Sequence, residues 1–382
     1  MTTSDTTNDD RAPSPTDPAA DRRAAYDYRS DDVEAPELVD ALDDRVDGDV
    51  RVDSYTRELF ATDASAYRER PVGVVAPRST DDVEAVMTYC AAENIPVLPR
   101  GGGTSLAGQA VNEAVVLDFK RYMNEVVDVD PDAGTARARP GVTIARLNDA
   151  VEPHGLKFAP DPAWGDKSVL GGAIGNNTTG AHSLKYGKTD AYVESCEVVL
   201  ADGTRTTFGW VDVDDLHDRA VAAREAGSTI EAQVYAEVGR LIHEEAAEIE
   251  ARYPPLKRNV SGYNLDMLVD DAKERGAVNL ARLLAGSEGT LAIVTEATVS
   301  LEPIPPETAV VMLTYDGVVS AMRDVAPILE HDPAAVEVMD DVLLDMARDT
   351  PEFADLVATL PEGTAATLLV EFYADTPDAG RR

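Results

Sequence analysis

The chain has 382 residues, enough for about two or three domains, and 44% of them are hydrophobic, which is ample for buried cores. Its 34 Lys and Arg residues against 71 Asp and Glu residues give a formal net charge of −37, spread along the whole chain. That charge argues against nucleic acid or an anionic membrane as a partner. It suits a globular protein in concentrated salt, where screening weakens the self-repulsion, so we expect the cytoplasm of a halophile.

The two cysteines, Cys90 and Cys196, lie in periodic apolar segments and are interpreted as buried, reduced thiols. Because the chain has no Cys-x-x-Cys pair, the sequence predicts neither structural zinc nor an iron–sulfur cluster, and we expect no metal site. No apolar run approaches the ~20 residues that span a membrane. We therefore expect no integral membrane segment and a cytoplasmic protein.

The N-terminal part of the chain changes from a polar segment to an α/β pattern. Residues 1–32 are rich in Asp, Thr, Pro and Ala and are predicted to be disordered, and a short acidic helix is expected within 33–50. Strands are predicted at 72–76 and 95–98. Between them, Ser79 and the residues that follow are typical of a helix N-terminus.

The next elements alternate between strands and a helix. Strands are predicted at 115–118, 126–130 and 135–138, and a helix from Thr143 to Val151. The last two strands are separated by Asp-Pro-Asp-Ala-Gly, a sequence rich in turn-forming residues. We therefore expect them to form a hairpin.

The C-terminal half combines an insertion with the beginning of a new unit. A long β segment at 192–200 is followed by a polar, acidic and helically periodic stretch at 210–255, which is interpreted as an insertion. Apolar β character returns at 283–301, and a new unit begins at Glu307. We expect that unit to be part of a larger domain. Its predicted elements are a strand at 309–314, a helix at 317–331, a strand at 335–339, a helix at 341–348 and a strand at 365–373.

Three consecutive glycines, Gly101 to Gly103, follow the strand predicted at 95–98 and precede Thr104 and Ser105. A stretch with few Cβ atoms lets successive N–H groups point at one object, and the two hydroxyl groups add donors. Such a loop can hold a diphosphate without a metal or a lysine cluster. A glycine-rich turn that binds no ligand is the alternative interpretation.

Two common phosphate-binding motifs fail in this chain. The dinucleotide motif G-x-G-x-x-G has Leu106 where its third glycine belongs, and a Walker A motif ending at residues 187–189 would need a glycine at His182. The sequence therefore disfavours a nicotinamide-dependent enzyme and a nucleotide kinase. A second glycine-rich segment, 168–180, allows two loops to grip one extended diphosphate from opposite sides, which suits a flavin dinucleotide.

Short motifs occur in an order typical of one flavoprotein family, at 99–109, 160–162, 168–180, 182–187, 198–203, 262–265 and 286–295. On these motifs the chain resembles the vanillyl-alcohol oxidase/p-cresol methylhydroxylase flavoproteins. Within that family it looks like the FAD-linked D-2-hydroxyacid dehydrogenases of the D-lactate, glycolate and D-2-hydroxyglutarate type. It is similar to the N-terminal flavin half of large members in which an iron–sulfur domain follows.

The resemblance implies an α+β fold with two domains. Residues 33–306 would form a two-subdomain FAD-binding domain of the p-cresol methylhydroxylase type, with the helical insertion at 210–255. Residues 307–382 would form a partial ferredoxin-like cap domain that contributes to the substrate site. The segment 1–32 would be an acidic tail outside both domains.

The resemblance also implies how FAD is held. The first loop would bind the pyrophosphate, mostly through backbone N–H groups, and the second would approach the flavin. Ile293 and Val294 would meet the adenine or ribose, and Glu288 would orient their turn. We expect non-covalent FAD, because Gly103 stands where some relatives carry a flavin-linked His. The residues implied to bind FAD are Arg100, Gly101, Gly102, Gly103, Thr104, Ser105, Gln109, Pro160, Asp161, Ser168, Gly171, Gly172, Asn176, Asn177, Thr178, Gly180, Tyr186, Gly187, Glu288, Ile293 and Val294.

Two residues are candidates for contact with the substrate. Arg258 could pair bidentately with a substrate carboxylate, or it could form a surface ion pair. His182 could face the flavin as a catalytic residue, or it could cap the turn after the second glycine loop. Tyr186 could contact the flavin, or it could have only a packing role.

The resemblance implies a function with one alternative. The chain would be an FAD-dependent oxidoreductase that oxidises a small D-2-hydroxyacid to the 2-oxoacid by hydride transfer to flavin. Electrons would pass to an acceptor or an iron–sulfur partner, with the protein cytoplasmic or peripheral to the membrane electron-transfer chain. The metal motif His-x-Gly-Asp-Gly-Asn-x-His of the relatives does not occur in this sequence. The alternative is therefore a non-catalytic FAD-binding subunit, or a truncated fragment that needs a separate polypeptide for the metal-bearing cap.

Overall fold

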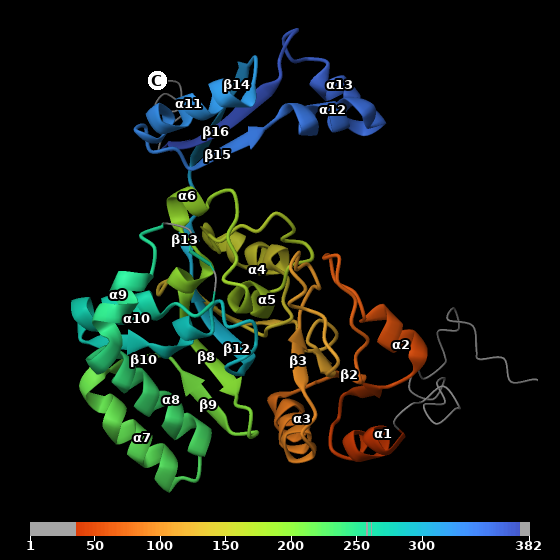
Figure 1. Ribbon diagram of the computed structural model, residues 1–382, viewed down its shortest axis with the longest axis vertical. Helices are drawn as coiled ribbons and strands as arrows, with labels where there is room; N and C mark the ends of the chain where they lie inside the picture. Colours follow the sequence, from red (N-terminus) through yellow and green to blue (C-terminus); the bar gives the residue numbers. More distant parts are fainter. Residues whose placement is uncertain (1–35, 257–258, 261, 375–382) are drawn as a thin grey trace, which may run out of the picture.

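The computed structural model describes residues 36–256, 259–260 and 262–374. The segment 1–32, for which disorder is predicted, lies outside the described residues. Figure 1 shows two sheets side by side in the lower part of the molecule, a group of helices flanking one of them, and a separate C-terminal unit above. The sheets form the body that carries the glycine loops.

The first subdomain is a four-stranded sheet packed against α3 (Thr80–Glu93). Its strand order is β1-β2-β4-β3, parallel except for β1. As predicted, Ser79 caps α3, accepting a hydrogen bond from the N–H of Asp82, and the helix ends where Asn94 adopts a left-handed conformation. The remaining elements are α1 (Pro36–Asp43), β1 (Asp49–Arg51), α2 (Ser54–Leu59), β2 (Gly73–Ala76), β3 (Val97–Arg100) and β4 (Val115–Asp118).

The second subdomain is a five-stranded antiparallel sheet with the order β5-β6-β12-β8-β9. The predicted hairpin at 126–138 is present as β5 and β6. The helix predicted to start at Thr143 is present as α4, with Thr143 as its N-cap, which accepts a hydrogen bond from the N–H of Arg146. The central strand β12 alternates buried and partly exposed side chains, as expected for a sheet with one face in a core. The elements are β5 (Val126–Asp130), β6 (Thr135–Ala138), α4 (Ile144–Val151), β8 (Val193–Val199), β9 (Arg205–Phe208) and β12 (Ile293–Ser300).

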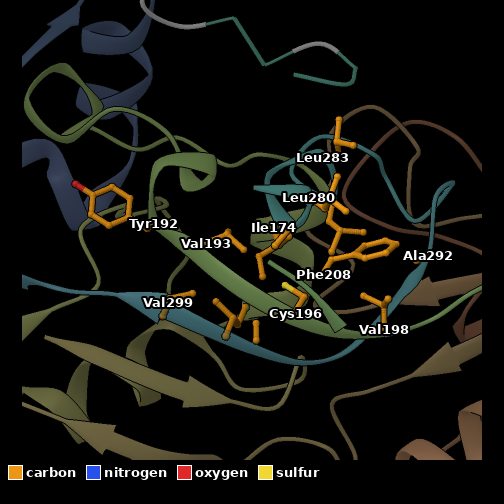
Figure 2. Packing of buried hydrophobic residues seen from close by; sticks show 14 of the residues in the cluster. Ile174, Tyr192, Val193, Cys196, Val198, Phe208, Leu280, Leu283, Ala292 and Val299 are labelled. Carbon is orange, nitrogen blue, oxygen red and sulfur yellow. The ribbon is translucent and has the colours of Figure 1, made fainter. Parts of the chain in front are cut away.

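The main core fills the space over the second sheet. Figure 2 shows Cys196 on β8 and Phe208 on β9 pointing toward Ile174 and Leu280, which come from segments far apart in the sequence. All four side chains are at most 1% exposed. Burying an apolar side chain of this size stabilises the fold by about 1.5–3 kcal/mol. The predicted burial of both cysteines as free thiols is confirmed.

The stretch predicted as a helical insertion begins with a strand, so the prediction is wrong at its start. Residues Trp210–Asp212 form β10, which pairs antiparallel with β11 (Ala277–Asn279) and ties the insertion back to the body. Tyr235 and Val238 of α8 belong to the main core. The helices of this region are α7 (Leu216–Glu225), α8 (Thr229–Arg240), η4 (Leu241–Glu245), α9 (Ala246–Arg252) and α10 (Leu265–Arg275).

Short elements connect the glycine loops to the sheets and to the cap. The second glycine loop runs into α5 (Leu170–Gly175), and β7 (Leu156–Lys157) pairs with β13 (Glu302–Pro303) just before the C-terminal unit. The other short helical turns are η1 (Glu152–His154), α6 (Ser183–Tyr186), η2 (Thr189–Tyr192), η3 (Val213–Asp215) and η5 (Leu280–Leu283).

The C-terminal unit is a three-stranded antiparallel sheet in the order β14-β16-β15, with α11 packed on one face. The strand that comes last in sequence lies between the first two, which is the split β-α-β arrangement of a ferredoxin-like unit. All of its predicted elements are present, and α13, whose first turn contains Pro351, was not predicted. They are β14 (Glu307–Tyr315), α11 (Val318–Leu329), β15 (Ala335–Met339), α12 (Asp341–Asp349), α13 (Pro351–Val357) and β16 (Ala366–Ala374).

Candidate functional site

A cavity of about 650 Å³ lies where the two glycine loops meet a third turn, residues 286–289. Its volume is within the roughly 300–1,000 Å³ of small-molecule and cofactor sites. Its polar and glycine lining consists of Arg100, Gly101, Gly102, Gly103, Thr104, Ser105, Gln109, Ser168, Gly171, Gly172, Gly175, Asn176, Thr178, Thr179, Ser287, Glu288 and Gly289. Its larger apolar side chains are Pro99, Leu106, Phe119, Pro140, Pro162, Trp164, Val169, Leu284 and Val294.

The first glycine loop packs too closely on the second for any larger residue. A Cβ atom on Gly101 would lie 2.3 Å from Cγ2 of Val169, and one on Gly102 would lie 2.2 Å from the carbonyl oxygen of Lys167. Gly103 has φ +64°, a conformation that side chains disfavour. The glycines therefore bring bare backbone from both loops to one wall of the cavity.

Arg100 stabilises the first loop from behind. The residue is 9% exposed, and its guanidinium donates hydrogen bonds to the carbonyl oxygens of Phe60 at 3.0 Å, Thr62 at 2.7 Å and Ala110 at 2.7 Å. Burial lowers the pKa of Arg100. Because these donors are engaged by backbone oxygens, Arg100 fixes the loop, which lines the cavity, on the segments that flank it.

Side chains from three distant segments meet at the edge of the cavity. Nε2 of Gln109 lies 3.3 Å from Oδ1 of Asn176 and 3.3 Å from Oε1 of Glu288, and Ser105 donates to Gln109. Glu288 has φ +53°, and its N–H donates to the carbonyl oxygen of Gly175. The third turn is thus held against the second loop, so the two form a continuous wall.

The cavity fits the diphosphate of a flavin dinucleotide. A diphosphate needs close backbone N–H groups and hydroxyl donors, and the walls offer glycine backbone without Cβ atoms together with Thr104, Ser105 and Ser168. Oγ1 of Thr104 and Oγ of Ser168 lie 3.4 Å apart, side by side in the lining of the cavity, so both hydroxyls are within reach of one bound group. The fit rests on these two loops, which the sequence predicts to bind the diphosphate from opposite sides.

Some residues implied to bind FAD do not line this cavity. These residues are Pro160, Asp161, Asn177, Gly180, Tyr186, Gly187 and Ile293. Asn177 is fully buried, between two residues that do line the cavity. Conversely, sequence reasoning missed Trp164 and Leu284, because an apolar side chain in a loop carries no signal of a ligand. The role of each residue toward FAD remains a prediction.

His182 lies where the body meets the C-terminal unit. Its Nδ1 is 3.1 Å from Oδ2 of Asp161 and its Nε2 is 3.1 Å from Oε1 of Glu371 on β16. Nearby, Nζ of Lys157 donates to the hydroxyl of Tyr373 at 3.3 Å and lies over its ring. Burial lowers the pKa of Lys157, and burial together with Glu371 raises the pKa of Tyr373. The cluster is a junction between the two units.

Arg258, the predicted partner of a substrate carboxylate, lies outside the described residues. Within the described ranges, no three His, Cys, Asp or Glu side chains are grouped so that they could hold a metal ion. The helices of the described part of the chain are all too short or too polar to cross a membrane.

Two family models match the chain. The FAD binding domain matches residues 71–209, which include both glycine loops, and the C-terminal domain of FAD linked oxidases matches residues 304–382. The first match lies within the body, and the second covers the C-terminal unit. The residues between them, 210–303, include the insertion and the third turn of the cavity.

Curated relatives are named after the oxidation of 2-hydroxyacids. D-2-hydroxyglutarate dehydrogenase of Pseudomonas putida is 33% identical over 90% of this chain and 34% of its own length. Glycolate oxidase subunit GlcD of Bacillus subtilis is 32% identical over 82% of this chain and 54% of its own length, and D-lactate dehydrogenase of Archaeoglobus fulgidus is 32% identical over 70% and 47%. The chain thus spans between a third and just over half of these proteins.

A solved structure supports the fold. Alkyldihydroxyacetonephosphate synthase superposes with a TM-score of 0.61 at 19% sequence identity, over 91% of this chain and 57% of that one. At that identity the likeness concerns the fold, and it extends over both the body and the C-terminal unit.

Proposed function

The chain belongs to the FAD-linked oxidases and uses FAD as its cofactor, and we propose that it oxidises a D-2-hydroxyacid to the 2-oxoacid. The observation that carries the proposal is the cavity between the two glycine loops, whose walls lack Cβ atoms where a diphosphate would lie. The substrate class is supported by the names of the relatives, which cover 2-hydroxyglutarate, glycolate and lactate. When bound, FAD supplies an acceptor for the hydride that leaves the carbon bearing the hydroxyl group.

In this proposal the chain's residues hold and orient the cofactor. Gly101 to Gly103 allow backbone N–H groups to approach the diphosphate, and Thr104, Ser105 and Ser168 donate from their hydroxyls. Gln109 and Glu288 connect the opposite walls, which keeps their separation constant. The apolar side chains of Trp164, which is 51% exposed, and of buried Leu284 line the rest of the cavity.

The substrate would enter near the junction of the body and the C-terminal unit. His182, Lys157 and Tyr373 meet there, beside the loop that contributes Pro162 to the cavity. Both ring nitrogens of His182 already face carboxylates, so a substrate hydroxyl could reach Nε2 only after Glu371 moves away. This arrangement favours His182 as a residue that holds the junction over His182 as the proton acceptor.

A second candidate function is that of an FAD-binding subunit completed by another polypeptide. The C-terminal sheet favours it, because edge strand β14 carries exposed apolar side chains: Val310 is 55% exposed, Val311 44% and Met312 48%. Apolar side chains that gather on one open edge are typical of a surface that another protein covers. Under this second candidate function, the chain would also have an electron acceptor or an iron–sulfur protein as a partner.

The deciding experiment is anaerobic reduction of the purified flavoprotein. Protein isolated in concentrated salt should carry a yellow flavin that acid releases, and D-2-hydroxyglutarate, D-lactate or glycolate should bleach it, with L-lactate as the control. Bleaching that requires an added polypeptide would support the subunit. A colourless protein that cannot be reconstituted with FAD would contradict both candidates.

A further inference from the structure

Behind the second glycine loop lies a group of buried polar side chains that do not line the cavity. Asn177 is 0% exposed, Asp190 2%, Asn264 4% and Lys188 9%. They come from three segments: the end of the glycine loop, the turn before β8, and the start of α10. A buried polar group of this size is costly unless each member has partners, so its contacts are informative.

Within the group, Asn177 and Asp190 bind each other at two points. Nδ2 of Asn177 donates to Oδ2 of Asp190 at 3.0 Å, and the backbone N–H of Asp190 donates back to Oδ1 of Asn177 at 3.0 Å. Asn177 has φ +46°, a left-handed conformation that this two-point contact holds in place. The contact therefore sets the backbone of the glycine loop at its turn.

Lys188 neutralises the buried carboxylate and extends the group to a third segment. Its Nζ lies 2.8 Å from Oδ2 of Asp190, 2.7 Å from the carbonyl oxygen of Asn259 and 3.4 Å from Oδ1 of Asn264. The ammonium group thus has three acceptors. A buried ion pair gains little stability over an apolar pair, so its value here lies in the geometry that it imposes.

The group connects two segments of one cavity wall, the second glycine loop and the 286–289 turn. Asn177 lies between Asn176 and Thr178, which line the cavity on one side. Nδ2 of Asn264 donates at 2.8 Å to the carbonyl oxygen of Ala285, immediately before the turn that supplies Ser287, Glu288 and Gly289 to the same lining. Lys188 joins these segments through Asp190 and Asn264, and Nδ2 of Asn177 also donates directly to Oδ1 of Asn264 at 3.4 Å.

We propose that Lys188 and Asp190 are positioning residues for FAD, which set the spacing of the second glycine loop and the 286–289 turn without touching the cofactor. The proposal rests on the cavity being the FAD site, as proposed above. Loss of the pair lets the second glycine loop and the 286–289 turn shift relative to each other, and the cavity then exchanges FAD faster and holds it in a less defined orientation.

The cleanest test is the double variant Lys188→Met/Asp190→Asn, which removes both charges and leaves no unpaired buried ion. Its apoprotein should melt near the parent temperature, since neutral replacement of a buried pair is often tolerated. Its dissociation constant for FAD, measured by flavin fluorescence, should rise about tenfold or more, because the bonds to Asn259 and Asn264 are lost. The visible circular dichroism of the bound flavin should weaken.

Two further variants separate positioning from general stability. Asn177→Gly keeps the left-handed backbone accessible but deletes the two-point contact, and it should also weaken FAD binding. Asp49→Asn removes a carboxylate that is 5% exposed on β1, an edge strand of the other sheet, where Arg121 faces it at 3.0 Å. That control should lower the melting temperature and leave the dissociation constant for FAD unchanged.

The inference is wrong if the double variant and Asn177→Gly both bind FAD within about twofold of the parent. It is also wrong if Asp49→Asn weakens FAD binding as much as they do, since the weaker binding would then reflect a general loss of stability. Retention of FAD by a variant at Gly102 would instead overturn the location of the FAD site. The two failures are therefore distinguishable.

Discussion

Nε2 of His182 lies 3.1 Å from Oε1 of Glu371, a residue 189 positions later in the chain. Since Nδ1 of the same ring faces Asp161, one imidazole joins the loop beside the cavity to the central strand of the C-terminal sheet. The position of that sheet over the body thus depends on a few polar side chains at the junction, among them Lys157 and Tyr373.

Glu371→Ala should loosen the C-terminal unit without affecting FAD binding. The pair is partly exposed, so its loss should cost no more than about 1 kcal/mol of docking free energy. Hydrogen exchange of the α6 and β16 amides should accelerate while exchange in β12 is unchanged. Glu337→Ala, an exposed glutamate on the neighbouring strand β15, is the matched control. Equal exchange in both variants would contradict a role for the His182–Glu371 contact.

Gly102→Ala should abolish retention of FAD. The new Cβ would lie 2.2 Å from the carbonyl oxygen of Lys167, so the two glycine loops would be forced apart where the diphosphate is expected. The measurement is the ratio of flavin to protein after gel filtration. Gly317→Ala is the control, because nothing lies within 4 Å of its Cβ. A Gly102→Ala protein with a full complement of flavin would exclude this loop as the diphosphate site.

Glu197 should contribute to stability above acidic pH. Although burial alone would raise its pKa, hydrogen bonds from Arg205, Thr80 and Thr295 lower it overall. Its contribution is therefore present above the ordinary glutamate pKa of about 4.3 and is lost as the pH falls through the lower folded value.

The measurement for Glu197 is the melting temperature against pH. In Glu197→Gln the acid limb of the curve should be shallower than in the parent, and the variant should be less stable near neutral pH. Glu58→Gln, which alters a surface contact with Arg68 and Arg70, is the control. An unchanged acid limb in Glu197→Gln would show that Glu197 titrates alike in the folded and unfolded states.

Salt should stabilise this protein strongly. The net charge of −37 produces self-repulsion in the folded state that dissolved ions screen, so the melting temperature should rise steadily with KCl concentration. Melting temperatures measured with sucrose in place of KCl are the control, because sucrose is excluded from the protein surface but does not screen charge. A melting temperature independent of KCl would contradict the expectation of a protein adapted to concentrated salt.

Much of the local structure could be predicted because the signals are local. The cap at Ser79, the hairpin at 126–138 and every predicted element of the C-terminal unit follow from capping residues, turn residues and periodicity. The strand at Trp210–Asp212 could not be predicted, because the polar, helically periodic residues after it dominate the pattern. Its pairing with β11 depends on residues far along the chain.

The sequence by itself predicted FAD and the two glycine loops that line the cavity, because a glycine lets the backbone approach a ligand closely whatever surrounds it. Only the tertiary structure decided which neighbours face the cavity. Asn177 turns into a buried polar group while Asn176 and Thr178 line the wall, and Trp164 enters the lining from a loop with no motif of its own. The physical reason is that packing between distant segments decides which way a loop side chain points. Here the deciding contacts are those of Lys188 with Asp190, Asn259 and Asn264.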